Sequence, residues 1–152
     1  LSGSTKYLNG RTLVNAGTAN WSGGALTFQN GAVFENRLGA SFTVQTIASM
    51  DNYGGSGSRS FNNAGAFAKT SGGGNTIINV PFNNTGGVQA QNGSLVFDGG
   101  FTQTAGSTLL NGGGISSGST INITAACWRV RGPWAPVFPA AARSVRARPP
   151  AC

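Results

Sequence analysis

The chain has 152 residues, 25 of them glycine, and only 9% of its residues are charged. Good helix formers at a helical period are missing, and glycine costs roughly 1 kcal/mol relative to alanine inside a helix, so composition argues against a helical or doubly wound fold. Histidine is absent, which excludes triads with a histidine base and histidine-ligated metals. What remains are short apolar runs cut by Gly and Asn, the pattern of strands between turns.

The net charge of +7 is unevenly distributed. Residues 1–124 hold five Lys and Arg against three acidic side chains, a balance of +2, and the other five Arg follow. A nucleic-acid interface needs cations clustered on a folded surface and interleaved with aromatics, so we expect no nucleic-acid partner. No apolar run approaches the ~20 residues of a membrane helix, and we expect no membrane insertion by this segment.

Residues 1–12 are polar and are expected to form an incomplete first turn of a repeat. The repeat itself begins with Leu13, and the stretch from Leu13 to Phe28 matches a later one, from Phe82 to Phe97, at Asn, Gly, Gly, Leu and Phe positions without a gap. Self-similarity at fixed offsets is typical of a repeat architecture.

An apolar-x-Asn phrase, followed by Gly two or three residues later, marks each repeat. A period of ~20 to 21 residues is that of one coil of a parallel β-helix, with two or three short strands and their turns. We therefore predict an all-β fold, a right-handed parallel β-helix of about five coils over residues 1–124. The Asn positions are Asn15, Asn36, Asn63 and Asn84, at intervals of 21, 27 and 21 residues, with a weaker echo at Thr104-Ala-Gly106.

The repeated Asn has two readings, both structural. Side-chain amides at one turn of successive coils can stack as a ladder, which satisfies polar groups that the turn would otherwise bury. Asn followed by Gly also tolerates left-handed backbone geometry at a turn. We expect a combination of the two, and no ligand at these positions.

The longer interval, between Asn36 and Asn63, predicts a loop that leaves the coil. The surplus is placed in the polar, Gly-rich stretch from Ala48 to Ser60. Insertions in β-helix proteins gather on one face and often form the binding surface, and Asp51, Tyr53 and Arg59 could hydrogen-bond to a sugar ring and stack on it. The alternative is a mobile loop without a ligand.

The composition changes abruptly at Ala125, so we predict a separate tail over residues 125–152. Five of the six prolines and both cysteines lie there, together with five Arg. Proline cannot donate to a strand ladder, so the last coil is expected to end near Ile123. The tail is interpreted as disordered, and as either native or the product of an out-of-frame reading.

No catalytic, metal or cofactor site is predicted, and we expect a protein that is not an enzyme. The acidic residues Glu35, Asp51 and Asp98 are too dispersed for a pair of carboxylates facing one glycosidic bond. Asp98 is the best single acid candidate, although an Asp before Gly99-Gly100 is more commonly a turn former.

The repeats resemble those of bacterial secreted β-helix proteins, such as autotransporter passengers and filamentous surface adhesins. The phrases that carry the likeness are Phe61-Asn-Asn-Ala-Gly-Ala-Phe, the stretch from Phe82 to Phe97, and Phe101-Thr-Gln-Thr-Ala-Gly-Ser-Thr-Leu. The resemblance implies a β-helix exported to the bacterial outer surface or secreted.

We therefore expect a structural or adhesive module, a stiff stalk with weak contacts to glycans or to proteins of a host or neighbouring cell. Uncapped strand edges also make end-to-end self-association an expectation. The alternative is a fragment of a β-helical polysaccharide lyase or hydrolase whose catalytic acids lie outside this chain. A third possibility is ice binding through threonines such as Thr102 and Thr120.

Overall fold

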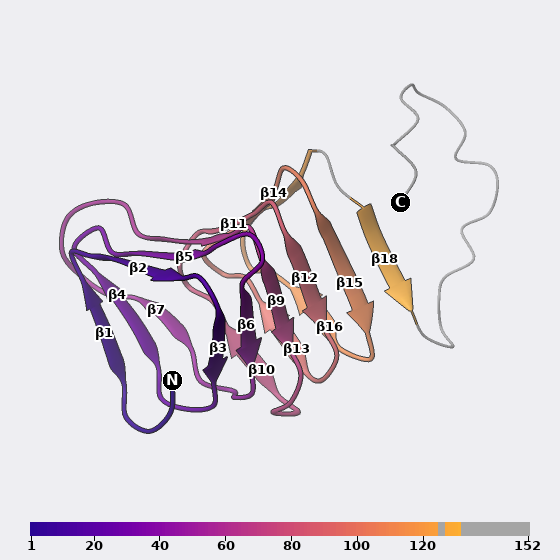
Figure 1. Ribbon diagram of the computed structural model, residues 1–152, viewed down its shortest axis with the longest axis horizontal. Coiled ribbons are helices and arrows are strands. Elements are labelled where there is room, and N and C mark those ends of the chain that lie inside the picture. The colour runs from indigo at the N-terminus through magenta and orange to yellow at the C-terminus, as the bar shows by residue number, and fades with distance from the viewer. Residues whose placement is uncertain (125–126, 132–152) are drawn as a thin grey trace.

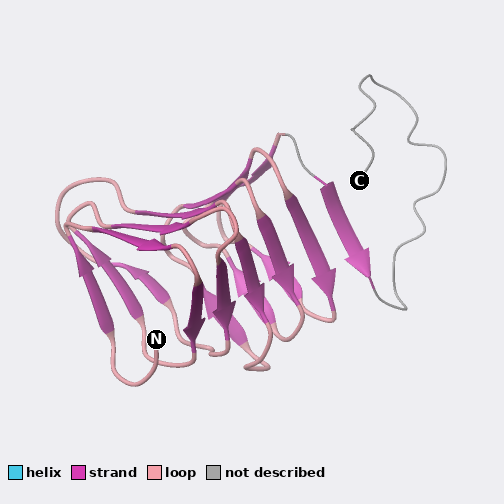
Figure 2. Cartoon of the chain, in the orientation of Figure 1, coloured by secondary structure: helices cyan, strands magenta, loops and turns pink. Residues whose placement is uncertain are grey.

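A computed structural model of the chain describes residues 1–124 and 127–131. Over this part of the chain every regular element is a short β-strand, and the strands pair in parallel with the strand three places further along the sequence, except between β7 and β10. The result is a solenoid, in which the chain winds around an apolar interior (Figures 1 and 2). The predicted all-β parallel solenoid is confirmed, with six turns rather than about five, because the first residues already form a complete turn.

Each turn contributes one strand to each of three faces (Figure 1). The first face contains β1 (Lys6–Asn9), β4 (Leu26–Gln29), β7 (Met50–Asn52), β10 (Asn75–Ile77), β13 (Ser94–Val96) and β16 (Gly114–Ser116). The second face contains β2 (Thr12–Asn15), β5 (Val33–Asn36), β8 (Ser60–Asn63), β11 (Phe82–Asn84), β14 (Phe101–Gln103) and β17 (Ile121–Ile123). The third face contains β3 (Thr18–Trp21), β6 (Ser41–Val44), β9 (Ala66–Lys69), β12 (Gly87–Ala90), β15 (Ser107–Asn111) and β18 (Cys127–Arg131).

The interior is built from stacked aromatic rings. Strand alternation turns every second side chain inward, and parallel strands about 4.8 Å apart bring rings of equal register face to face. On the second face the rings of Phe34, Phe61, Phe82 and Phe101 stack at centroid distances of 4.7, 5.0 and 5.8 Å. On the third face Phe42 and its neighbour in β9 stack at 5.4 Å, and the two stacks meet edge to face.

The predicted Asn ladder is present at the turn between the second and third faces, which we call the ladder corner. Each side-chain amide donates to the carbonyl oxygen of the next, from Asn15 to Asn36 (2.8 Å), to Asn63 (2.7 Å) and to Asn84 (2.7 Å). Asn84 donates in turn to Oε1 of Gln103 (3.1 Å). The second amide hydrogen of these Asn residues goes to a backbone carbonyl of the turn or the following strand.

The ladder corner places backbone directly against backbone. A Cβ atom added to Gly86 would lie 2.1 Å from the carbonyl oxygen of Gly65, whereas one added to the next residue, Gly87, would meet nothing within 4 Å. Gly86 is therefore required by the close approach of successive turns, and not by an unusual backbone angle.

The first face is broken into two three-stranded sheets, one of β1, β4 and β7 and the other of β10, β13 and β16. The register explains the break, because Met50 at the start of β7 pairs with Ile78, which follows the end of β10. The two strands thus occupy successive parts of the same face and meet only at this bridge. The residues that would lie beside β10 in the preceding turn belong to a connection, 45–49, and not to a strand.

Lys69 holds this irregular region together. Its side chain is fully buried at an inward position of β9, where neighbouring turns have apolar residues. Its Nζ donates to the carbonyl oxygens of Thr46 (3.0 Å) and Ser71 (3.1 Å) and to Oγ1 of Thr76 (2.9 Å). The ammonium group therefore uses two donors on the turns between the third and first faces, which we call the lysine corner, and the third donor on the neighbouring strand β10. Burial lowers the pKa of Lys69 from its ordinary value.

The strand ladder continues beyond Ile123, where the sequence predicts the last coil to end. β18 pairs with β15 along its whole length, at the 20-residue offset of the preceding turn. Its sequence, Cys-Trp-Arg-Val-Arg, contains no proline, and the first proline of the tail comes only at position 133. The rest of the predicted tail, 125–126 and 132–152, lies outside the described residues.

At the other end, the first turn leaves strand edges and part of the interior uncovered. Leu1 lies beside Trp21 in the parallel pattern, with its amino group donating to the Asn20 carbonyl and its own carbonyl accepting from Ser22 N. Leu13, at the head of the Phe34 stack, is 43% exposed and helps to line an apolar hollow of about 440 Å³. The predicted end-to-end association would use this end, and it stays a prediction.

Candidate functional site

A row of polar side chains crosses the outer surface of the first three turns. The register of the first face aligns Tyr7 of β1 with Thr27 of β4 and with Asp51 of β7. These residues alternate with the buried Leu8, Leu26, Phe28 and Met50, so their side chains point away from the interior. Three different turns, 20 and 24 residues apart, thus bring one residue each to the same row.

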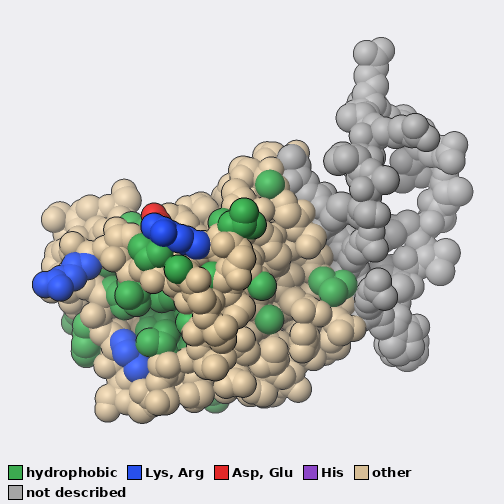
Figure 3. Space-filling view, viewed as in Figure 1, with side chains coloured by type: hydrophobic (Ala, Val, Ile, Leu, Met, Phe, Trp, Pro, Cys, Tyr) green, Lys and Arg blue, Asp and Glu red, His purple; other side chains and the backbone are tan. Residues whose placement is uncertain are grey.

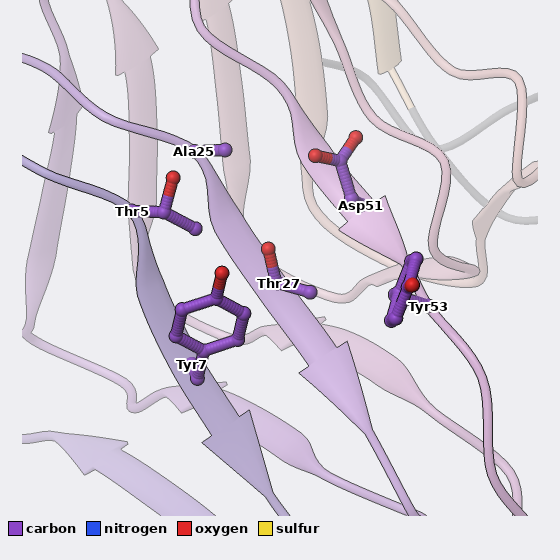
Figure 4. Close-up of a pocket in the computed structure, with 6 residues that line it drawn as sticks. All are labelled: Thr5, Tyr7, Ala25, Thr27, Asp51 and Tyr53. Atoms are coloured by element: carbon purple, nitrogen blue, oxygen red, sulfur yellow. The ribbon is translucent and has the colours of Figure 1, made fainter.

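Two tyrosines stand on either side of a low floor. Tyr7 is 66% exposed and Tyr53, directly after β7, is 65% exposed, whereas Thr27 on the middle strand is only 5% exposed. Tyr53 is held at its backbone, where its N–H donates to the Phe28 carbonyl oxygen (3.0 Å). Figure 4 shows the two rings flanking Thr27, with Asp51 above. This shallow hollow, which we call the tyrosine face, has a volume of about 390 Å³ and is lined by Thr5, Tyr7, Ala25, Thr27, Asp51 and Tyr53.

The carboxylate of Asp51 is held by a residue that lies outside its three-stranded sheet. Nδ2 of Asn79, a residue that follows β10, donates to Oδ1 of Asp51 at 3.2 Å. The backbone N–H of Asn79 also donates to the carbonyl oxygen of Met50 (2.8 Å). Asn79 therefore spans the break in the first face and orients the carboxylate. None of the described residues donates a hydrogen bond to the other oxygen, Oδ2, which can accept hydrogen bonds from a ligand.

Arg59, the third predicted binding residue, does not join the other two. Its Nη1 donates to the carbonyl oxygens of Gly54 (2.6 Å) and Gly55 (3.1 Å), within its own loop. The sequence predicts a ligand-facing cation here, but the guanidinium is used to close the loop, because the turn at Gly54-Gly55 exposes carbonyl groups that need donors. Asp51 and Tyr53, the other two predicted binding residues, both line the tyrosine face. Their role in binding stays a prediction.

The loop packs onto the preceding turn. Gly57 lies against Gly31, and a Cβ atom on Gly55 would collide with the side chain of Asn30. The sequence predicts that the whole surplus between Asn36 and Asn63 falls in this region, but only part of it does. The connection 53–59 has seven residues where the preceding turn has three, but the ladder-corner turn 37–40 is also two residues longer than 16–17.

The sequence prediction missed Tyr7, because residues 1–12 were expected to form only part of a turn. A signal for it exists. Asn9-Gly10 recurs as Asn30-Gly31 at an offset of 21 residues, and the structure joins these turns by a hydrogen bond from Asn30 Nδ2 to Asn9 Oδ1 (2.6 Å). Aligning the two turns places the strand of Tyr7 beside the strand of Thr27, although this offset of 21 residues pairs Tyr7 with Phe28, and the structure pairs it with Thr27 at an offset of 20.

The chemistry of the tyrosine face suits a ligand rich in hydroxyl groups. Exposed tyrosines offer an apolar ring surface and a hydroxyl that donates and accepts, and the ionised carboxylate accepts only. The charged side chains of the surface shown in Figure 3 are few, and the acidic group visible there lies beside a basic one. Ring stacking and hydrogen bonding are therefore the main sources of affinity that this surface offers.

The acidic residues lie on three different elements and face different surroundings. Glu35 belongs to β5 on the second face, and Asp51 to β7 on the first. Asp98 lies in the turn after β13, and its Oδ1 accepts a hydrogen bond from Gly118 N at 2.8 Å, which ties this turn to the next turn of the solenoid. The local turn-forming role expected of Asp before Gly stays a prediction. Within residues 1–124, whose side chains are described, no group of three His, Cys, Asp or Glu side chains could hold a metal ion.

None of the described segments forms a helix that is long and apolar enough to cross a membrane. Comparison with known proteins finds no family model, curated protein or solved structure that matches the chain.

Proposed function

We propose that the chain is an adhesive module of a bacterial surface or secreted protein, a stiff spacer that contacts glycans through its tyrosine face. The observation that carries the proposal is the pair of exposed tyrosines, 66% and 65% accessible, on either side of a floor of small side chains with a carboxylate beside it. Large exposed aromatic residues held on a rigid scaffold are typical of binding surfaces.

The architecture supports the role of a spacer. The Asn ladder and the Phe stack run continuously along the axis through several turns, so bending would strain many side-chain contacts at once. Six turns at about 4.8 Å each give a length on the order of 25 to 30 Å. The resemblance of the repeats to those of secreted β-helix adhesins supports the placement at a bacterial surface.

Binding of the purified chain to an immobilised panel of oligosaccharides tests the proposal. Replacing Tyr7 or Tyr53 by Ala should weaken binding about five- to tenfold, because each change removes one stacking surface. Both side chains are exposed, so the free energy of unfolding should change by less than about 0.5 kcal/mol. Leu38→Ala is the matched control, since Leu38 is 88% exposed and lies at the ladder corner.

Equal losses in the control and in the tyrosine variants would contradict the proposal. Release of sugar fragments from a polyuronate by the chain would favour a polysaccharide lyase instead.

A further inference from the structure

We propose that the tyrosine face selects uncharged saccharides over acidic ones, with Asp51 as the specificity-determining residue and Asn79 as its positioning residue. This inference rests on the proposed glycan contact and names the class of ligand. Its argument is one of charge and hydrogen-bond direction at the hollow between Tyr7 and Tyr53.

Asp51 is the charged member of the group that lines the hollow. An ionised carboxylate accepts hydrogen bonds but cannot donate them, and Asn79 already occupies one side of Oδ1. A ligand must therefore bring donors to Oδ2, and the hydroxyl groups of a neutral sugar do so. A uronate or sialate carboxylate brings a second acceptor and a second negative charge to the same place.

The nearby cations do not line the hollow. The amine of Lys6, next to Tyr7 in sequence, donates to the carbonyl oxygens of Gly3 (3.3 Å) and Gly23 (2.7 Å). The guanidinium of Arg59 is bound to its own loop. Both cationic groups donate to backbone carbonyls, and neither residue lines the hollow, so neither is positioned there to pair directly with an acidic ligand.

The tyrosines cannot make this distinction. Neutral and acidic sugars present the same carbon-bound hydrogens to an aromatic ring, so stacking on Tyr7 or Tyr53 contributes similar affinity to both. Discrimination falls to Asp51, whose orientation depends on Asn79. Because β7 and β10 meet only at the Met50 bridge, the Asn79 side chain is what reaches the carboxylate across the break.

The test compares dissociation constants for gluco-, manno- and galacto-oligosaccharides with those for their uronate or sialylated counterparts. The intact chain should bind the neutral members about tenfold more tightly. Asp51→Asn keeps the size of the side chain and removes its charge, so this preference should fall to about twofold or less. Glu35→Gln, which removes an acid from the second face, is the matched control and should keep the preference.

Two further measurements separate selectivity from loss of structure. Asn79→Ala should reduce the preference and leave Tyr-dependent stacking in place, so that the Tyr53→Ala loss is the same in both backgrounds. Raising the salt concentration should improve binding of acidic members to the wild type and not to Asp51→Asn, because salt screens charge repulsion.

The outcomes separate the two proposals. If Asp51→Asn keeps the preference for neutral saccharides, or if the wild type prefers acidic ones, the inference is overturned. The proposed glycan contact would still hold. If the folded wild type binds no member of the panel at millimolar concentration, the proposed function fails, and the inference fails with it.

Discussion

The ladder corner and the lysine corner solve the same problem in different ways. Both must satisfy polar groups where the chain turns between faces. At the ladder corner the same residue type recurs, and Asn36, Asn63 and Asn84 satisfy one another from turn to turn. At the lysine corner a single side chain, Lys69, reaches the carbonyls of two turns of the chain.

The difference has a structural consequence. A repeated solution fixes the register of every turn, and the second and third faces beside the ladder corner are continuous six-stranded sheets. Lys69 does not recur from turn to turn, so the strand register beside it can shift. The first face, beside the lysine corner, divides between β7 and β10. The tyrosine face lies on the first half of that divided face. Regularity thus serves stability, and the irregular face carries the candidate site.

The largest expected effect concerns the close approach at the ladder corner. Gly86→Ala would drive a methyl group into the backbone of the preceding turn, and the free energy of unfolding should fall by about 3 kcal/mol or more. Gly87→Ala, one residue later, meets open space and should be neutral or stabilising by about 0.5 kcal/mol. Denaturant unfolding of both variants measures the contrast, and similar losses would mean that the turns are not in contact.

A smaller effect is expected within the ladder. Asn63→Ala removes an acceptor from the Asn36 amide and a donor from the Asn84 carbonyl, both buried, and should cost about 2 to 3 kcal/mol. Asn15→Ala, at the exposed end of the ladder, should cost about 1 kcal/mol. Equal costs at the two positions, measured by denaturant unfolding, would show that the amides act independently.

The sequence predicts the ladder corner well because repetition is visible in a sequence. The apolar-x-Asn phrase alone identifies Asn15, Asn36, Asn63 and Asn84, and the hydrogen bonds between them follow from the strand spacing. At the turn after Asn84 the predicted ladder position is wrong by one residue. The echo at Thr104 suggests an offset of 20 residues, whereas the register pairs Asn84 with Gln103, and Gln103 continues the ladder.

The candidate site is less predictable because it depends on residues that occur once. Asp51 and Tyr53 are found from the predicted insertion 48–60, although the structure places Asp51 in β7 and only Tyr53 in the connection that follows. The direction of the Arg59 side chain depends on carbonyls exposed by its own loop. Lys69 carries no sequence signal for its role, since an inward lysine in a strand is the opposite of what alternation predicts. Its acceptors, Thr46 and Ser71, become neighbours only when the turns stack.

The smallest predicted effect concerns the lysine corner. It is small because the free energy of unfolding should change only in alkaline solution. Burial lowers the pKa of Lys69 in the folded chain below its ordinary value of 10.5. Between the two pKa values the unfolded chain binds more protons than the folded one, so the free energy of unfolding should rise with pH through that window and level off above 10.5. Lys69→Met removes the titrating group while keeping an apolar stem of similar length.

Denaturant unfolding of the wild type and of Lys69→Met at several alkaline pH values isolates this contribution. Every other side chain is shared by the two proteins, so the difference between their free energies of unfolding reports the contribution of Lys69. That difference should shift in favour of the wild type as the pH approaches 10.5. Lys6→Met, which removes a lysine whose amine binds carbonyls near the surface, is the matched control for the exchange of one lysine for methionine. A flat difference for Lys69→Met would mean that burial at the lysine corner does not lower the pKa of Lys69, and that the fold bears no cost for the buried ammonium group.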